Sequence, residues 1–203
     1  MNKIFFIGIA GSTASGKTYF ANNLVKRFGD DNAALLPLDS YYHNRDDLSF
    51  EEREKINYDH PSAFEINLLI DHINQLKNQS SVNVPIYDYS NHRRSDSFFE
   101  VKPKKIIIIE GILALHFDEL VKEFNYKIHI DTPIDICLER RIARDISERS
   151  RTKESVLHQW EKTVLPMYLQ YVEPHQDRAD LILSGVENLD KRIIQIHKII
   201  NSL

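Results

Sequence analysis

Short apolar runs alternate along the chain with segments in which apolar residues recur at every third or fourth position. Five runs have the length and composition of β-strands: Ile4–Ile9, Ala34–Leu38, Lys105–Ile109, Lys127–Ile130 and Leu181–Leu183. Within the third run, Ile106–Ile109 is continuously apolar, which is typical of a strand buried on both faces. Alternating strands and helices predict an α/β fold whose parallel sheet is covered by helices on both sides.

Apolar stripes predict the helices. One helix is expected to begin near Ser62, because Glu65 completes a capping box with it. Another begins after Pro133, and the last begins at about Leu189. Their predicted stripes are Ile66, Leu69, Ile70, Ile73 and Leu76 in the first helix, Ile134, Leu138, Ile142 and Ile146 in the second, and Leu189, Ile193, Ile196, Ile200 and Leu203 in the last.

One stretch, residues 82–101, departs from this alternation. Val84–Tyr89 and Ser97–Val101 both have strand character and are separated by turn-forming residues. They predict a β-hairpin inserted into the domain. Because such insertions often carry a second substrate, the hairpin is a candidate binding element.

The first strand leads into the motif Gly-x-x-x-x-Gly-Lys-Thr, which is followed by apolar residues at helical spacing. Strand, motif and helix together indicate a phosphate-binding P-loop. Gly11 and Gly16 allow the backbone N–H groups to converge on an anion, Lys17 neutralises phosphate charge, and the Thr18 hydroxyl can ligate Mg²⁺. The sequence therefore predicts binding of a nucleoside triphosphate through Gly11, Ser12, Thr13, Ala14, Ser15, Gly16, Lys17 and Thr18.

Composition narrows the class of protein. The 203 residues, 42% apolar and 28% charged, predict a single globular domain over residues 1–203. A net charge of −4 gives no indication of nucleic-acid or membrane binding. No apolar run approaches the ~18 residues that cross a membrane. Cys137 is the only cysteine, which excludes an intramolecular disulfide and favours a cytoplasmic location.

Two carboxylates follow predicted strands. Glu110 ends the strand that begins near Lys105, where a nucleotide-bound Mg²⁺ requires a carboxylate, although it could also turn into solvent. Asp39 ends the second strand and has two chemical uses, a water-mediated metal contact or a general base for an attacking hydroxyl. Alternatively, Asp39 caps the following turn.

Five arginines and no lysine lie within twelve residues: Arg140, Arg141, Arg144, Arg149 and Arg151. Such a run is often a solvated helix face, and neighbouring acidic residues could form pairs four positions apart. The use of arginine without lysine, however, favours bidentate phosphate recognition. Residues 147–152 resemble a mobile loop between two helices, so the spacing leaves a phosphate-binding lid and a solvated face equally open.

Aromatic residues accompany polar groups in two segments, Tyr58–Pro61 and Tyr87–Arg93. Aromatic rings can stack on a planar base while Asp or His binds its polar edges. Hairpins also carry aromatic residues for packing alone.

The order and spacing of these motifs resemble the uridine (uridine–cytidine) kinases over nearly the whole chain. The matching segments are Gly8–Gly11, Ser15–Thr18, Leu38–Tyr42, Asp59–Phe64, Pro85–Tyr89, Glu110–Leu113, Arg144–Arg149, Val164–Met167, Glu173–Pro174 and Ala179–Asp180. The resemblance implies a P-loop kinase with a five-stranded parallel sheet, the hairpin over the nucleoside site and an arginine-bearing lid at residues 140–153. It implies transfer of the γ-phosphate of ATP or GTP, with Mg²⁺, to the 5′-hydroxyl of uridine or cytidine.

The resemblance also implies roles for individual residues. Asp39 would be the base, acting with the catalytic groups Lys17, Arg144 and Arg149, and Arg151 would also meet the triphosphate. Thr18 and Glu110 would serve Mg²⁺, partly through water with Asp39. The nucleoside would contact Asp39, Tyr42, Tyr58, Asp59, Tyr87, Tyr89, His92, Arg141 and Gln159. Members are commonly tetramers and are often inhibited by CTP, so small-molecule substrates and a homo-oligomer are expected.

The chain departs from the family pattern at two positions where glycine is usual. β-Branched Thr13 narrows the backbone angles available to the P-loop, and Ser150 between the lid arginines would stiffen the lid. Neither change removes a charge, so altered rates or nucleotide preference are expected rather than loss of activity.

Three alternative functions remain. A related kinase of phosphoribulose or pantothenate is disfavoured by Tyr87 and His92, since those substrates have no base to recognise. A nucleotide-dependent switch is disfavoured because the chain has no Asn-Lys-x-Asp motif. A non-catalytic regulator would be expected to lack Asp39, Lys17 or the lid arginines, and all are present.

Overall fold

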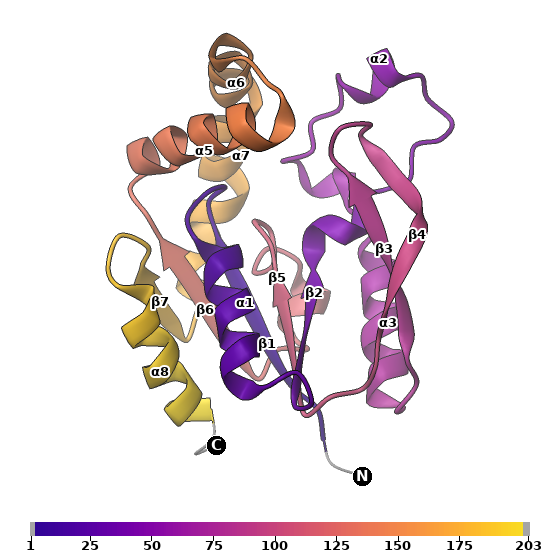
Figure 1. The fold of residues 1–203 in the computed structure, drawn as a ribbon, viewed down its shortest axis with the longest axis vertical. Coiled ribbons are helices and arrows are strands. Elements are labelled where there is room, and N and C mark those ends of the chain that lie inside the picture. Colours follow the sequence, from indigo (N-terminus) through magenta and orange to yellow (C-terminus); the bar gives the residue numbers. More distant parts are fainter. Residues whose placement is uncertain (1–2, 201–203) are drawn as a thin grey trace.

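The computed structural model describes residues 3–200 except the side chain of Leu189. Five strands form one parallel sheet in the order β2-β5-β1-β6-β7, as the strand–helix alternation predicts (Figure 1). Their bounds are β1 Phe5–Gly11, β2 Ala33–Pro37, β5 Ile106–Glu110, β6 Tyr126–Asp131 and β7 Leu181–Ser184. Each predicted strand is thus confirmed to within two residues.

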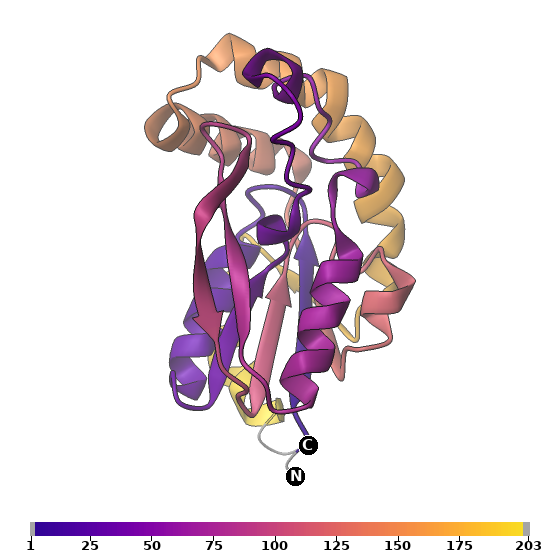
Figure 2. The same ribbon diagram turned by 90° about the vertical axis from the view of Figure 1, so that its right-hand side faces the viewer.

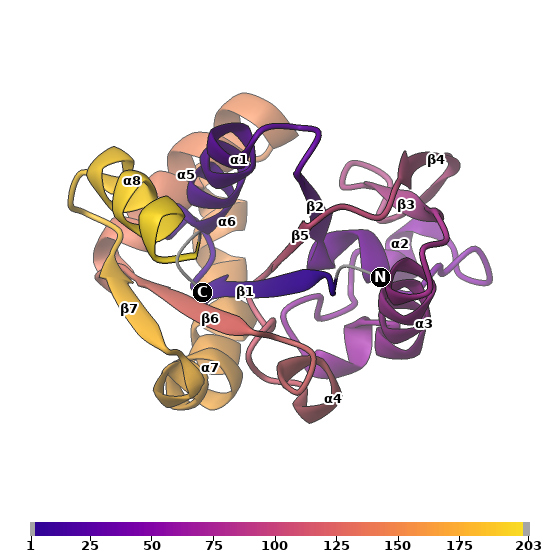
Figure 3. The same ribbon diagram turned by 90° about the horizontal axis from the view of Figure 1, so that it is seen from below.

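Helices cover both faces of the sheet (Figure 3). One face is covered by α1 and α8, and the other by α3, α4 and α7. The bounds are α1 Lys17–Phe28, α2 Phe50–Arg53, α3 Ile66–Lys77, α4 Asp118–Val121, α5 Ile134–Arg149, α6 Lys153–Gln159, α7 Leu165–Met167 and α8 Leu189–Ile200. None of the helices within residues 3–200 is long and apolar enough to span a membrane.

The two larger of the three hydrophobic clusters among the described residues lie on opposite faces of the sheet. Alternate residues of β5 enter them: Ile107 and Ile109 pack with the α3 side, while Ile106 and Ile108 pack with the α1 and α8 side. Burial of both faces explains why the first four residues of β5 are all isoleucine. The predicted stripe of α8 is confirmed at Ile193, Ile196 and Ile200, whereas Leu203 lies outside the described residues.

The predicted start of α3 is wrong. The helix begins at Ile66, and Glu65 occupies its N-cap position without making a side-chain cap. Ser62 instead lies in a 3₁₀ turn and hydrogen-bonds the His60 ring. Glu65 forms an ion pair with Arg94 of the hairpin at 2.8 Å, which removes it from the capping box. The predicted stripe itself is confirmed by the complete burial of Leu69.

The buried face of α5 also differs from the prediction. Its fully inward positions are Cys137, Arg141 and Asp145, four residues apart, while Ile146 is 46% exposed. Ile134 and Leu138 are only partly buried. The helix therefore turns a polar face inward at its carboxyl end.

The predicted hairpin is present as β3 Val82–Asp88 and β4 Arg93–Val101, an antiparallel pair with a bulge between Pro85 and Tyr87. It stands beside α3, with its turn beneath the helices at the top of the molecule (Figure 2). The insertion thus brings its aromatic turn to the same end of the fold as the carboxyl ends of the parallel strands.

His60, His116 and His175 form a histidine cluster around Tyr171. The His116 ring contacts His175 at 4.7 Å and Tyr171 at 5.2 Å between ring centroids. The Tyr171 hydroxyl lies 3.2 Å from Nε2 of His60. Burial, with the neighbouring His175 and Arg178, lowers the pKa of His116 to about 4.

We expect this cluster to make stability depend on pH. The neutral ring of His116 is favoured in the folded state, so its contribution is fully present above pH 6.5 and is lost as pH falls through about 4. His116→Gln should therefore flatten the decline of the melting temperature between pH 7 and pH 4.5, while His158→Gln, exposed on α6, should not. Thermal melts across this range test it; equal slopes for His116→Gln and the wild type would contradict it.

Candidate active site

A cleft of about 1460 Å³ opens at the carboxyl ends of the sheet strands, lined by residues of the hairpin and of the helices α5 and α6. Sites for single small molecules span roughly 300–1,000 Å³, so the cleft has room for two ligands. Among the predicted site residues, Gly11, Ser12 and Ser15 are buried and do not line it. All the others do: Thr13, Ala14, Gly16, Lys17, Thr18, Asp39, Tyr42, Tyr58, Asp59, Tyr87, Tyr89, His92, Glu110, Arg141, Arg144, Arg149, Arg151 and Gln159.

The P-loop forms one wall of the cleft. A Cβ atom at Gly11 would lie 2.5 Å from the carbonyl oxygen of Ile130, so the loop approaches β6 too closely for a side chain. Left-handed backbone occurs at Ala14 (φ 57°) and Gly16 (φ 98°). Strain is therefore located at Ala14 rather than at Thr13, where the sequence led us to expect a restriction. The Thr13 hydroxyl instead accepts a hydrogen bond of 3.0 Å from Arg141.

Lys17, Thr18 and Glu110 meet at the floor of the cleft. Lys17 is 9% exposed, and its Nζ donates to the Ser12 carbonyl at 3.4 Å. The Thr18 hydroxyl donates to Oε1 of Glu110 at 3.2 Å, whereas the buried Oε2 has no hydrogen-bond partner. Burial raises the pKa of Glu110, and Lys17 opposes this. Glu110 therefore points inward, which contradicts its alternative as a solvent-exposed strand end.

These groups fit a magnesium ion that a nucleotide brings with it. The described residues contain no cluster of three or more His, Cys, Asp or Glu side chains that could hold a metal alone. Mg²⁺ commonly binds through one or two protein ligands, substrate phosphates and water. The unpartnered Oε2 of Glu110 and the Thr18 hydroxyl supply hard oxygen ligands of this kind.

Asp39 lies in the 3₁₀ turn Leu38–Tyr41 that follows β2. Its Oδ2 accepts a hydrogen bond of 3.0 Å from the Tyr89 hydroxyl. The Arg149 guanidinium lies 4.4 Å from the centroid of the Tyr89 ring. Tyr89 thus connects the β3–β4 hairpin both to Asp39 and to Arg149 of the lid. Burial, reinforced by Asp39, raises the pKa of Tyr89.

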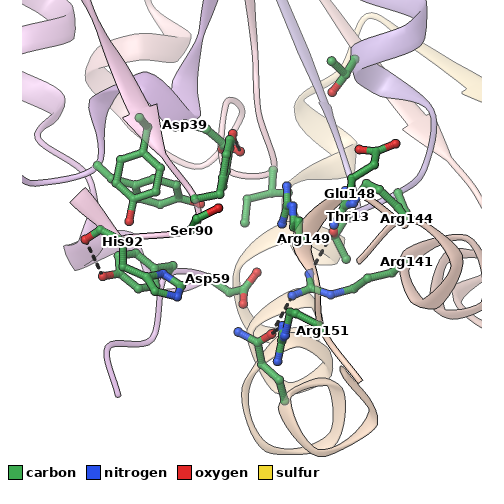
Figure 4. A pocket seen from close by; sticks show the side chains of 18 of the residues that line it. Thr13, Asp39, Asp59, Ser90, His92, Arg141, Arg144, Glu148, Arg149 and Arg151 are labelled. Carbon is green, nitrogen blue, oxygen red and sulfur yellow. Dashed lines mark hydrogen bonds between the residues drawn. The ribbon is translucent and has the colours of Figure 1, made fainter. Parts of the chain in front are cut away.

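Asp59 and Arg141 face the cleft from opposite sides (Figure 4). Burial raises the pKa of the Asp59 carboxyl, and the charge of Arg141 opposes the shift. Arg141 is 6% exposed and donates to Gln159 at 3.0 Å as well as to Thr13. A carboxylate and a guanidinium at this position can bind vicinal hydroxyls as acceptor and donor.

Aromatic rings line the hairpin side of the cleft. The rings of Tyr58 and His92 are stacked, with centroids 5.2 Å apart and an interplanar angle of 15°. Tyr87 lies 4.9 Å from Tyr42 and 5.3 Å from Tyr89. Burial lowers the pKa of His92, which favours its neutral ring. This arrangement can hold a flat heterocycle by stacking and by hydrogen bonds to a neutral imidazole.

The lid arginines gather on one buried carboxylate, Asp145, which the sequence interpretation did not select as a site residue. Arg144, Arg149 and Arg151 all lie within 4.0 Å of it. The sequence did indicate a charge cluster here, because Arg141, Asp145 and Arg149 are spaced four residues apart and so share one helix face. The predicted loop over residues 147–152 is shorter than expected, because α5 continues to Arg149 and α6 begins at Lys153. Arg140, in contrast, donates to the Gly185 carbonyl.

Ser150, at the turn between α5 and α6, has a left-handed backbone with φ 53°. A residue other than glycine costs about 1 kcal/mol in this conformation. Ser150→Gly should therefore raise the free energy of unfolding by about that amount, whereas Ser147→Gly within α5 should lower it by about 0.5–1 kcal/mol. Urea unfolding of both variants tests this, and destabilisation by both would refute it.

Comparison with solved structures places the fold among P-loop kinases. Phosphoribulokinase from Rhodobacter spheroides superposes with a TM-score of 0.68 at 16% identity, covering 91% of this chain and 71% of that one. D-glycerate 3-kinase from Cryptococcus neoformans var. grubii gives 0.68 at 16% identity, covering 93% and 88%. At these identities the likeness concerns the fold alone.

Sequence comparison identifies the family. The profile of the phosphoribulokinase / uridine kinase family matches residues 6–191. A uridine kinase from Escherichia fergusonii is 48% identical over 181 residues, covering 87% of this chain and 85% of the relative. A uridine kinase from Erwinia tasmaniensis is 46% identical over the same extent. The chain belongs to the phosphoribulokinase / uridine kinase family and is a kinase, which implies a phosphate donor of the ATP type and small-molecule substrates.

Proposed function

We propose that this kinase transfers the γ-phosphoryl group of ATP or GTP to the 5′-hydroxyl of uridine or cytidine, giving UMP or CMP. The observation that carries the proposal is the position of Asp39, between the P-loop and the aromatic hairpin, in one cleft. The identity of 48% to a uridine kinase supports it.

On the acceptor side, each group has a separate task. Asp59 and Arg141 would bind the ribose hydroxyls, and Tyr58, Tyr87 and His92 would hold the pyrimidine. This orientation would bring the 5′-hydroxyl to Asp39, which accepts its proton as the bond to phosphorus forms. The Tyr89 hydroxyl, already bonded to Asp39, would keep that carboxylate oriented.

On the donor side, the P-loop N–H groups and Lys17 would bind the phosphates, with Arg144, Arg149 and Arg151 above them. Thr18 and Glu110 would hold Mg²⁺, partly through water with Asp39, and the ion would neutralise developing charge on the transferred phosphoryl group. The chain's own residues position the reactants and exclude water, so that the nucleoside rather than solvent is phosphorylated.

We also propose that residues 1–203 form a single kinase domain in which residues 82–101 cover the nucleoside and residues 140–153 act as the lid. The resemblance to uridine kinases leads us to propose a homo-oligomer, a tetramer, which light scattering would test. A kinase of phosphoribulose or pantothenate is the alternative within the family. The stacked Tyr58 and His92 favour a substrate with a planar base over either compound.

The test is a coupled assay of ADP release with Mg·ATP and four conditions: uridine, cytidine, adenosine and no acceptor. Release that requires a pyrimidine nucleoside is the expected result, and the ratio of the two pyrimidine rates ranks the substrates. Release that does not depend on an acceptor, or that depends on phosphoribulose or pantothenate in added controls, would refute the proposal.

A further inference from the structure

Asp145 is the most completely buried charged group on the lid side of the cleft, with 0% exposure. Four guanidinium groups surround its carboxylate. The N···O distances are 2.8 Å from Arg144, 3.5 Å from Arg141, and 3.7 Å from both Arg149 and Arg151. One negative charge thus faces four positive charges, so the cluster as a whole remains strongly cationic.

The two oxygens of this carboxylate are used unequally. Oδ1 accepts two hydrogen bonds from the fork of Arg144, at 2.9 Å from Nε and 2.8 Å from Nη2. Oδ2 accepts no hydrogen bond and is held only by longer ion pairs, to Nε of Arg141 at 3.5 Å and to Nη1 of Arg151 at 3.7 Å. The directed hydrogen bonds of the carboxylate therefore all come from Arg144. A charge-assisted bidentate pair of this kind is the strongest single contact in the cluster.

Arg144 can bind either Asp145 or a phosphate, but not both with the same donors. A guanidinium fork matches the geometry of a carboxylate and of a phosphate equally well. Arg144 lines the cleft together with Arg149, Arg151 and Lys17, so its other possible partner is an anion held by the P-loop. The two N–H groups donated to Asp145 are withheld from that anion.

We propose that Asp145 is a positioning residue that competes with phosphate oxygens for Arg144 and so limits how tightly the lid holds phosphates, allowing the product nucleoside diphosphate to leave. The inference rests on the proposed function in that the anion is the phosphate chain of the donor. The physical reason is general. When only a fraction of the free protein has the binding group available, the apparent affinity for the ligand is reduced by that fraction.

A purely structural role predicts the opposite sign. The backbone carbonyl of Asp145 accepts N–H groups from Ser150 and Arg151 and so closes the end of α5. If the side chain only gathered the arginines, removing its charge would let them separate and would weaken anion binding. If it competes with the anion, removing its charge strengthens binding.

The experiment measures the affinity of Asp145→Asn for inorganic pyrophosphate by calorimetry. We expect about tenfold tighter binding than in the wild type, because asparagine can still accept a hydrogen bond from Arg144 but lacks the negative charge that strengthens the competing pair. We also expect affinity to fall more steeply with salt. The matched control is Glu148→Gln, which removes one negative charge from the same helix, α5, at a residue that lines the cleft. Glu148 forms no ion pair among the described residues, so its variant should change affinity less than about twofold. Unchanged or weaker binding by Asp145→Asn would overturn the proposal.

Kinetics and a wild-type measurement complete the test. In Asp145→Asn, kcat and the donor KM should fall together, as expected when product release slows. If that variant does not fold, nuclear magnetic resonance of wild-type arginine side chains decides, with Arg144 assigned by its loss in Arg144→Lys. The Nε–H signal of Arg144 should shift on saturation with pyrophosphate, and an unshifted signal would overturn the proposal. Since pyrophosphate binding needs no nucleoside, this result is independent of whether the acceptor assay succeeds.

Discussion

Asp39→Asn is expected to lower turnover by about two to four orders of magnitude, which is the contribution of a general base. Asparagine keeps the shape of the side chain and can still accept the hydrogen bond from Tyr89, so the hairpin should stay in place. What it loses is the ability to take the proton of the attacking hydroxyl. Donor affinity should remain nearly unchanged, because the donor's binding groups lie on the P-loop and lid.

Two measurements separate these effects. Steady-state ADP release with saturating uridine or cytidine gives turnover, and calorimetry with ADP gives donor-site affinity. Asp47→Asn is the matched control, because Asp47 is an exposed carboxylate paired with Arg45 on the surface, and its variant should retain full turnover. Full activity in Asp39→Asn would refute the assignment of Asp39 as the base.

Lys17→Met is expected to reduce kcat/KM for the donor by about two to three orders of magnitude, the usual cost of removing one preorganised donor from a developing negative charge. The lysine is almost completely buried beneath the loop, so its charge acts in a poorly screened environment. Methionine preserves the unbranched, apolar stem and removes only the ammonium group. The variant should therefore bind the donor more weakly and transfer the phosphoryl group more slowly.

Lys26→Met provides the comparison for this variant. Lys26 lies in the last turn of the same helix, α1, where the same substitution should leave kcat/KM within about twofold. Melting temperatures of both proteins show whether either substitution affects folding. A Lys17→Met enzyme with normal kinetics would indicate that the P-loop does not bind the donor phosphates.

The strands and the P-loop were predictable because their signals are local. Four consecutive isoleucines, at 106–109, indicate a buried strand. The glycines at 11 and 16 have the spacing of a phosphate-binding loop. The order of the strands in the sheet was not predicted, because β1 pairs with β5 and β6 rather than with β2, which follows it in sequence. The roles assigned to Asp39, Asp59 and the aromatic residues remain predictions, although the structure brings these side chains into one cleft.

The inward face of α5 was not predictable in the same way. Hydrophobic periodicity favours Leu138, Ile142 and Ile146, yet Arg141 is the residue that is buried. Its burial is possible because Thr13 and Gln159, far apart in sequence, accept its hydrogen bonds. The capping box at Ser62 failed for a similar reason.

There, Glu65 stays at the N-cap of α3, but its side chain pairs with Arg94 of the hairpin instead of capping the helix. Burial of charge depends on partners that only the tertiary structure supplies. The spacing of Arg141, Asp145 and Arg149 thus indicated neighbouring charges on one helix face, but it did not show that this face is buried.

The order of strands in the sheet has a consequence for how the chain acquires its structure. β1 has no hydrogen-bonded neighbour among the strands nearest to it in sequence, because its partners are β5 at residues 106–110 and β6 at residues 126–131. Pairing over such separations slows folding and leaves strand edges unprotected meanwhile. During synthesis, β1 can pair with strands on both of its edges only after more than half of the chain has been made. The P-loop is therefore among the first segments to be synthesised, but its strand is held in the sheet only after β5 and β6 have been added.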